Sequence, residues 1–81
     1  MIIKYIQGAM RLARYEILQD DGTFYGMIPD FQGVYANSET LEDCRNELQE
    51  VLEEWLVFKL LDGDTLPVVE GIELAFKRTD E

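Results

Sequence analysis

The residue types that most often carry catalysis are scarce in this sequence. Histidine is absent, which removes the commonest general base and the commonest transition-metal ligand. The single serine, Ser38, stands just before an expected helix start, with no histidine or lysine nearby to activate it as a nucleophile. We expect Ser38 to form a turn or a cap, and the sequence predicts no catalytic residue.

The single cysteine, Cys44, excludes an intramolecular disulfide and a zinc site built from several cysteines. Cys44 falls on the apolar stripe of an expected helix, where a free cysteine usually behaves as a small buried hydrophobe. Its place in the first helical turn would lower the pKa of the thiol, whereas burial would raise it. We therefore expect an inert thiol and no disulfide-built secreted fold.

Three carboxylates, Asp20, Asp21 and Asp30, resemble the acidic set of a two-metal nuclease. Aspartate is also a common turn residue, however, and all three lie in expected turns. The calcium-binding loop spacing is missing, and none of the glycines forms a phosphate-cradling loop before a helix. The sequence thus predicts no metal and no cofactor.

The chain is strongly acidic, with a formal net charge of −10 over 81 residues. Residues 1–40 carry five acidic and three basic side chains, whereas residues 41–81 carry twelve and four. This charge repels nucleic acid and suits a basic protein partner, although solubility alone also explains an acidic surface. The sequence contains neither a membrane-spanning apolar run nor a secretion signal, so we expect a cytoplasmic protein.

Apolar periodicity predicts a first helix over residues 2–13 and a hairpin with strands at 15–19 and 24–28. Asp21-Gly22 is a strong signal for a two-residue hairpin loop, which would pair Tyr15 with Ile28. The face with Tyr15 and Ile17 is the expected core face. The other face carries Leu18, Tyr25 and Met27, and is apolar enough that the first helix, a second copy or a partner is expected to cover it.

Pro29 ends the hairpin, and the remaining elements are a short strand at 34–37, a long helix at 40–62 and a strand at 72–77. Thr40 is the expected N-cap and Gly63 the expected left-handed residue after the helix. The expected apolar stripe of the helix comprises Leu41, Cys44, Leu48, Val51, Trp55 and Phe58, widened by Leu52 and Leu56. The prediction is one α+β domain over 1–81, with a mostly antiparallel sheet of three to four strands, one long amphipathic helix packed on it, a shorter N-terminal helix and a tail at 78–81.

One stretch resembles the HicB antitoxin family. The residues that carry the resemblance are Tyr15-Glu16-Ile17, the run from Asp21 to Val34 (DGTFYGMIPDFQGV), Thr40-Leu41-Glu42-Asp43-Cys44 and Leu52-Glu53-Glu54-Trp55-Leu56. The family's pattern is a strand, an Asp-Gly turn, a strand ending in Ile-Pro-acid-x-x-Gly, a short strand, and a helix opening Thr-x-Glu-acid-Ala/Cys. The resemblance covers about residues 14–77.

The resemblance implies a truncated RNase H-like β-β-β-α-β domain that neutralises a HicA-type toxin, a small basic mRNA-cleaving protein. It also implies dimers or tetramers. Many relatives carry a further C-terminal DNA-binding domain, and this sequence shows none after Lys77. We therefore expect this chain to bind protein and not DNA.

We weigh three functions. The first is an antitoxin-like module that covers the RNA-binding surface of a basic toxin; the second is a stand-alone homo-oligomeric regulatory or ligand-binding domain without a toxin. The third, a residual metal-dependent nuclease, is weak because Glu16 is the only acidic residue inside the first two strands. The expected partner-binding residues are Asp20, Tyr25, Glu47, Glu50 and Glu54.

Overall fold

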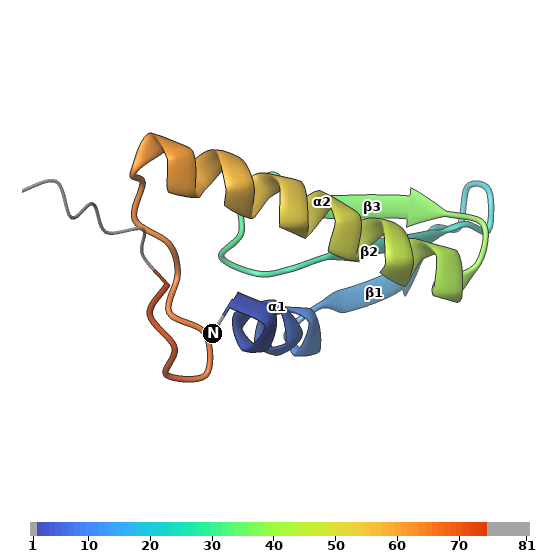
Figure 1. The fold of residues 1–81 in the computed structure, drawn as a ribbon. Coiled ribbons are helices and arrows are strands. Elements are labelled where there is room, and N and C mark those ends of the chain that lie inside the picture. The colour runs from blue at the N-terminus through green and yellow to red at the C-terminus, as the bar shows by residue number, and fades with distance from the viewer. Residues whose placement is uncertain (1, 75–81) are drawn as a thin grey trace, which may run out of the picture.

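The computed structural model describes residues 2–74 and has the order α-β-β-β-α (Figure 1). The elements are α1 (Ile2–Arg11), β1 (Arg14–Ile17), β2 (Phe24–Met27), β3 (Tyr35–Ser38) and α2 (Leu41–Asp62). The three strands form one antiparallel sheet in the order β1-β2-β3, and α2 lies across β2 and β3. The α+β class, the long helix and the short N-terminal helix are confirmed.

The hairpin between β1 and β2 has the predicted faces but a different register. Tyr15 pairs with Gly26, and not with Ile28 as predicted. The loop is longer than two residues, because the Leu18 amide donates to the Thr23 carbonyl at 2.8 Å. A register shift of two residues leaves each side chain on its original face, which is why the predicted faces remain correct.

Small residues let α2 approach the centre of the sheet closely. A Cβ atom added to Gly26 would lie 3.1 Å from the Cys44 sulfur and 2.8 Å from the Tyr15 ring. The Cys44 thiol also donates a weak hydrogen bond to the Ala36 carbonyl, with 3.7 Å between sulfur and oxygen. We call Gly26, Ala36 and Cys44 the small-residue seam. Because Gly26 faces α2, its strand neighbours Tyr25 and Met27 face the opposite side of the sheet.

Both ends of α2 are capped as predicted. The Thr40 hydroxyl accepts from the Asp43 amide at 3.0 Å, and acidic side chains in the first turn complement the helix dipole. At the other end Gly63 adopts φ 74°, and its amide donates to the Leu60 carbonyl at 3.2 Å. The helix therefore has fixed limits and spans 22 residues.

The buried line of α2 differs from the predicted stripe. The buried side chains step by four residues, and they are Cys44, Leu48, Leu52 and Leu56. Val51 and Trp55 are half-buried beside this line. Leu41 and Phe58 were predicted to lie in the core, and both predictions are wrong, because Phe58 is 65% exposed and Leu41 is 48% exposed. An α-helix has about 3.6 residues per turn, so a line of residues spaced by four winds gradually around it. Leu41 and Phe58, at the two ends of the predicted stripe, therefore lie outside the interface with the sheet.

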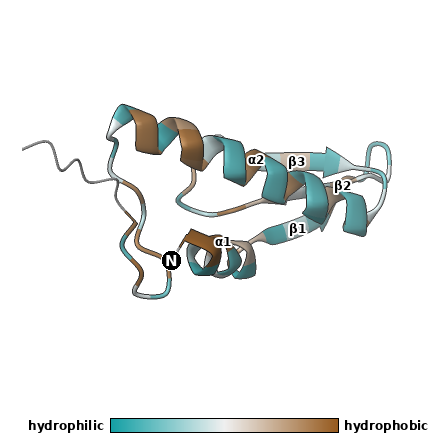
Figure 2. Cartoon of the chain, viewed as in Figure 1, coloured by the Kyte–Doolittle hydropathy of each residue, from teal (hydrophilic) through white to brown (hydrophobic). Residues whose placement is uncertain are grey.

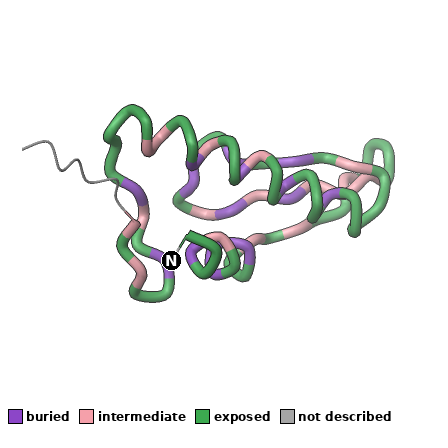
Figure 3. The backbone as a smooth tube through the Cα atoms, viewed as in Figure 1, coloured by how far each residue is buried: buried purple, intermediate pink, exposed green. Residues whose placement is uncertain are grey.

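The first helix packs against α2 and against the segment that follows α2 (Figure 3). Tyr5 is fully buried, and its hydroxyl donates to the Pro67 carbonyl at 2.6 Å. Gly8, which lowers the intrinsic helix propensity, leaves space for Val69, since a Cβ atom there would lie 2.7 Å from a Val69 methyl. The second sheet face is thus not covered by α1.

The predicted strand at 72–77 is wrong over its described part. Ile72 forms an isolated antiparallel bridge with Val69, and residues 73 and 74 belong to no strand. The Val69 and Ile72 backbones bond each other at 2.7 and 3.1 Å, which closes a tight turn around the positive-φ residues Glu70 and Gly71. Residues 75–77 lie outside the described part of the chain. Ile17, predicted to lie in the core, is 61% exposed because it sits at the hairpin end of β1.

The seam generates a stability prediction. We expect Gly26→Ala to lower the free energy of unfolding by about 1–3 kcal/mol, because the new methyl group clashes with the Tyr15 ring and the Cys44 sulfur. Urea denaturation followed by circular dichroism measures this change. Glu16→Ala, on the exposed opposite face of β1, is the control and should change stability by less than about 0.5 kcal/mol. Equal effects of the two substitutions would contradict a tight seam.

Candidate partner-binding surfaces

The predicted acidic residues of α2 share one stripe on the outer side of the helix. Glu47, Glu50 and Glu54 are all exposed and step by three and four residues, which places them in line. We call these three side chains the acidic stripe. Glu47 lies at the edge next to β3, because its carboxylate accepts from the Ser38 hydroxyl at 2.6 Å. The acidic stripe therefore lies on a capped, rigid helix.

Tyr25 lies on the other side of the sheet from the acidic stripe. Its ring stacks on that of Tyr35, with 6.2 Å between centroids and 26° between planes. Met27 is half-buried on the same face, and Tyr35 is exposed on β3. We call Tyr25, Met27 and Tyr35 the tyrosine face. The structure thus brings Glu47, Glu50 and Glu54 together, but they lie on the outer side of α2, whereas Tyr25 lies on the sheet face that points away from α2.

Asp20, the remaining predicted contact residue, lies in the exposed turn between β1 and β2. The turn is well ordered by hydrogen bonds. The Asp21 carboxylate accepts from the Thr23 hydroxyl at 2.7 Å and from the Thr23 amide at 3.1 Å. The hydrogen bond from the Thr23 hydroxyl, followed by that from its amide, lowers the pKa of Asp21. Asn37 of β3 ties the turn to the sheet by donating to the Thr23 hydroxyl at 2.8 Å.

The sequence did not reveal Tyr35 as a surface residue. The arrangement follows from the strand register, which the sequence alone does not show: Met27 pairs with Tyr35, so Tyr25 and Tyr35 are diagonal neighbours on one face. Two tyrosines on an uncovered sheet face form an apolar surface with polar tips, a combination common in protein–protein contacts.

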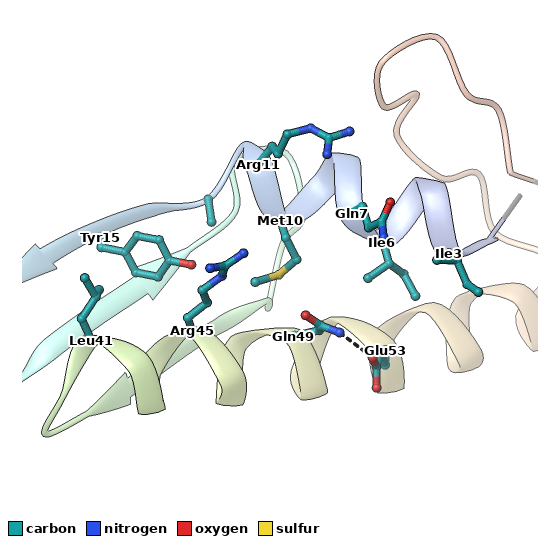
Figure 4. Close-up of a pocket in the computed structure, with 11 residues that line it drawn as sticks. Ile3, Ile6, Gln7, Met10, Arg11, Tyr15, Leu41, Arg45, Gln49 and Glu53 are labelled. Carbon is teal, nitrogen blue, oxygen red and sulfur yellow. Dashed lines mark hydrogen bonds between the residues drawn. The ribbon is translucent and has the colours of Figure 1, made fainter.

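A groove between α1 and α2 was also missed (Figure 4). Its volume is about 750 Å³, and apolar side chains of α1 point across it towards polar side chains of α2. Ile3, Ile6 and Met10 come from α1, while Gln49 and Glu53 come from α2 and bond each other at 3.1 Å. The sequence showed the helical spacing of Ile3, Ile6 and Met10, but it did not show that these side chains would face α2.

The described residues show no arrangement typical of a metal site or of an activated nucleophile. Among residues 2–74, no three histidine, cysteine or carboxylate side chains are close enough to hold a metal ion. Asp30 occupies a turn with φ 69°, apart from the hairpin turn that holds Asp20 and Asp21. Burial, followed by the charge of Glu47, raises the pKa of the Cys44 thiol. In the part of the chain that the structure describes, no helix is long and apolar enough to cross a membrane.

Comparison with known proteins identifies the family. The model of the UPF0150-like family matches residues 4–67, which is most of the chain. The chain belongs to the UPF0150-like family. A crystal structure of TTHA0281 from Thermus thermophilus is similar over 95% of each chain, with 38% sequence identity and a TM-score of 0.87. A search of curated proteins found no match.

The burial of Cys44 in this UPF0150-like domain generates a reactivity prediction. We expect the native thiol to resist alkylation by iodoacetamide, because the side chain is fully buried and its pKa is raised. The alkylation rate, followed by mass spectrometry, should rise to that of a free thiol only in denaturant. A Ser38→Cys, Cys44→Ser variant, with its thiol at a partly exposed position, should react readily in the native state and serves as the control.

Proposed function

We propose that this chain is an antitoxin-like binding module that covers the basic RNA-binding surface of a small toxin of the HicA type. The observation that carries the proposal is the acidic stripe, which holds Glu47, Glu50 and Glu54 exposed on a capped helix. The resemblance to HicB antitoxins over residues 14–77 names the class of partner. Family membership through the UPF0150-like model is compatible with the proposal.

The acidic stripe would compete with RNA through its charge. A protein that binds RNA phosphates presents arginine and lysine side chains, and a line of carboxylates can occupy the same positions. Negative charge fixed on a rigid helix attracts such a surface and raises the association rate. The net charge of −10 adds a long-range field of the same sign.

The edge of β3 offers a way for one partner to contact both predicted surfaces. Within the sheet that residues 2–74 form, β3 is an edge strand, with Glu47 on its α2 side and Tyr35 on the opposite face. A partner seated on this edge would meet the acidic stripe on one side and the tyrosine face on the other. In this arrangement the carboxylates supply steering, and the stacked tyrosines supply the apolar contact at the centre.

The functional experiment is co-expression. The probe is the product of the neighbouring open reading frame, which the proposal predicts to be a small basic protein containing a histidine. This chain should relieve the growth arrest that this product causes and should co-purify with it. Growth arrest that persists despite soluble expression of this chain would reject the antitoxin proposal and favour the stand-alone domain.

The acidic stripe generates a binding prediction. We expect the triple charge reversal Glu47→Lys, Glu50→Lys, Glu54→Lys to weaken binding of that basic protein about 100-fold, mainly through slower association. Surface plasmon resonance measures both rate constants. Wild-type affinity should also fall as salt rises, because screening weakens attraction between opposite charges.

The matched control carries the same change in net charge elsewhere. Glu42→Lys, Glu53→Lys, Glu73→Lys reverses three exposed carboxylates that lie outside both the acidic stripe and the tyrosine face. We expect this variant to bind within a few-fold of the wild type at moderate salt. Equal losses from the two triple variants would mean that only net charge matters and that the stripe is not the contact surface.

The tyrosine face generates a second binding prediction. We expect Tyr25→Ala to speed dissociation about tenfold, because truncation removes the stacked ring and exposes its neighbour. Leu12→Ala, which truncates an exposed apolar side chain just after α1, is the control. An unchanged dissociation rate for Tyr25→Ala would restrict the contact to the acidic stripe.

A further inference from the structure

The side of α2 that faces α1 across the groove differs in charge from the acidic stripe. Arg45, Gln49 and Glu53 step by four residues along this side, whereas the acidic stripe lies on the other flank of the helix. Figure 2 shows apolar residues at the start of α1 and a mainly polar first half of α2. The two helices run in opposite directions, so Met10 lies towards Arg45 and Ile3 lies towards Glu53 (Figure 4).

Arg45 gives the groove a cationic end. Arg11 also lines the groove, but its guanidinium is held by the Glu70 carboxylate through hydrogen bonds of 2.6 and 2.8 Å. Among residues 2–74, no carboxylate forms an ion pair with Arg45 and no acceptor bonds to it. In a chain of 17 acidic and 7 basic residues, a guanidinium that is left without a carboxylate can bind an anion from outside the chain.

Tyr15 adds a hydroxyl group beside Arg45. Its ring lies against Gly26, where even a Cβ atom would come within 2.8 Å of it, and its hydroxyl points along the groove towards Arg45 (Figure 4). Burial is the largest influence on the pKa of Tyr15 and raises it, while the charge of Arg45 acts in the opposite direction. The hydroxyl is therefore a protonated hydrogen-bond donor, fixed next to the guanidinium by the packing of β1 on α2.

The first helix supplies an apolar wall that leads away from Arg45. Met10, Ile6 and Ile3 follow one another over about 10 Å of α1. Ile6 is half-buried and Ile3 is 67% exposed, so an apolar ligand could still cover both side chains. The groove volume of about 750 Å³ falls in the range of small-molecule sites.

We propose that this groove binds a small organic acid, with its carboxylate on Arg45 and the Tyr15 hydroxyl and its unbranched apolar chain along Ile6 and Ile3. A planar guanidinium matches a carboxylate through two parallel hydrogen bonds. A phosphate dianion fits less well, because one guanidinium would have to balance two charges in an acidic protein. A segment of the proposed basic toxin is also a poorer occupant, because Arg45 would repel its cations.

Glu53 sets the direction in which the ligand lies. It is about 12 Å from Arg45 along α2, and its carboxylate accepts from the Gln49 amide at 3.1 Å. An acid that binds in the reverse direction, or one with a second carboxylate at its far end, would place negative charge near Glu53. The groove should therefore prefer a monocarboxylate to a dicarboxylate of the same length. The net charge of −10 opposes all anions alike, and salt screens this repulsion beyond about 8 Å.

The first experiment titrates the purified full chain with octanoate and follows the backbone amides by NMR. We expect a dissociation constant of about 0.1–1 mM, with the largest shifts in α1 and in the first half of α2. Arg45→Gln should weaken octanoate binding about tenfold, because it removes the charged hydrogen-bond donor. Arg14→Gln is the matched control, since exposed Arg14 pairs with Met27 on the tyrosine face, and it should bind within about twofold of the wild type.

The second experiment tests the direction of the ligand with suberate, which is octanoate with a second carboxylate at the far end. We expect suberate to bind at least about tenfold more weakly than octanoate. Glu53→Gln should raise the affinity for suberate about tenfold and change that for octanoate by less than about threefold. Glu50→Gln, on the outer side of α2, is the control and should leave the preference unchanged.

Three results would overturn the proposal: no amide shifts at about 10 mM octanoate, shifts confined to the acidic stripe or the tyrosine face, or equal losses from Arg45→Gln and Arg14→Gln when circular dichroism shows both variants folded. Suberate that binds as tightly as octanoate would also overturn it. The proposal does not rest on the antitoxin function, because the groove and the acidic stripe lie on different flanks of α2. A chain that binds octanoate but not the product of the neighbouring reading frame, or the reverse, identifies which proposal fails.

Discussion

The close approach of α2 to the centre of the sheet sets the geometry of the surfaces described above. Cys44 sits against the positions of Gly26 and Ala36, where a larger side chain would not fit. Dispersion attraction declines steeply with distance. The small-residue seam lets α2 and the sheet approach closely, so a few small buried side chains are enough to hold the two layers in contact. A domain of this size buries only a small core, so close packing between α2 and the sheet matters for its stability.

The same seam fixes which side chains are left outside. With α2 on one face, strand alternation directs Tyr25 and Met27 to the other face, and helical periodicity directs Glu50 and Glu54 away from the sheet. Neither surface depends on a mobile loop. Both are consequences of packing in the interior, so a partner meets side chains whose backbone is already ordered.

Local signals in the sequence were sufficient for the two helices and the first three strands. They were wrong about a strand beginning at Ile72, and insufficient for the contacts between elements. Thr40 and Gly63 marked the limits of α2 because capping depends on neighbouring residues alone. The hairpin faces were correct, but the register was wrong because loop length depends on hydrogen bonds such as that from Leu18 to Thr23. Phe58 was misassigned because a periodic pattern does not show where the layer beneath a helix ends. The groove beside α1 and the pairing of Tyr25 with Tyr35 required the packing of separate elements, which no local pattern contains.

Contacts between α1 and the segment after α2 hold the two ends of the described chain together. Tyr5 bonds the Pro67 carbonyl, Gly8 receives Val69, and the Arg11 guanidinium pairs with the Glu70 carboxylate at 2.6 Å. These contacts join side chains about sixty positions apart in the sequence, and each end of the described chain shields part of the other from solvent. Release of either end would uncover the other, so the two ends form a single cooperative unit of local unfolding. A protease would gain access to both ends in one opening event.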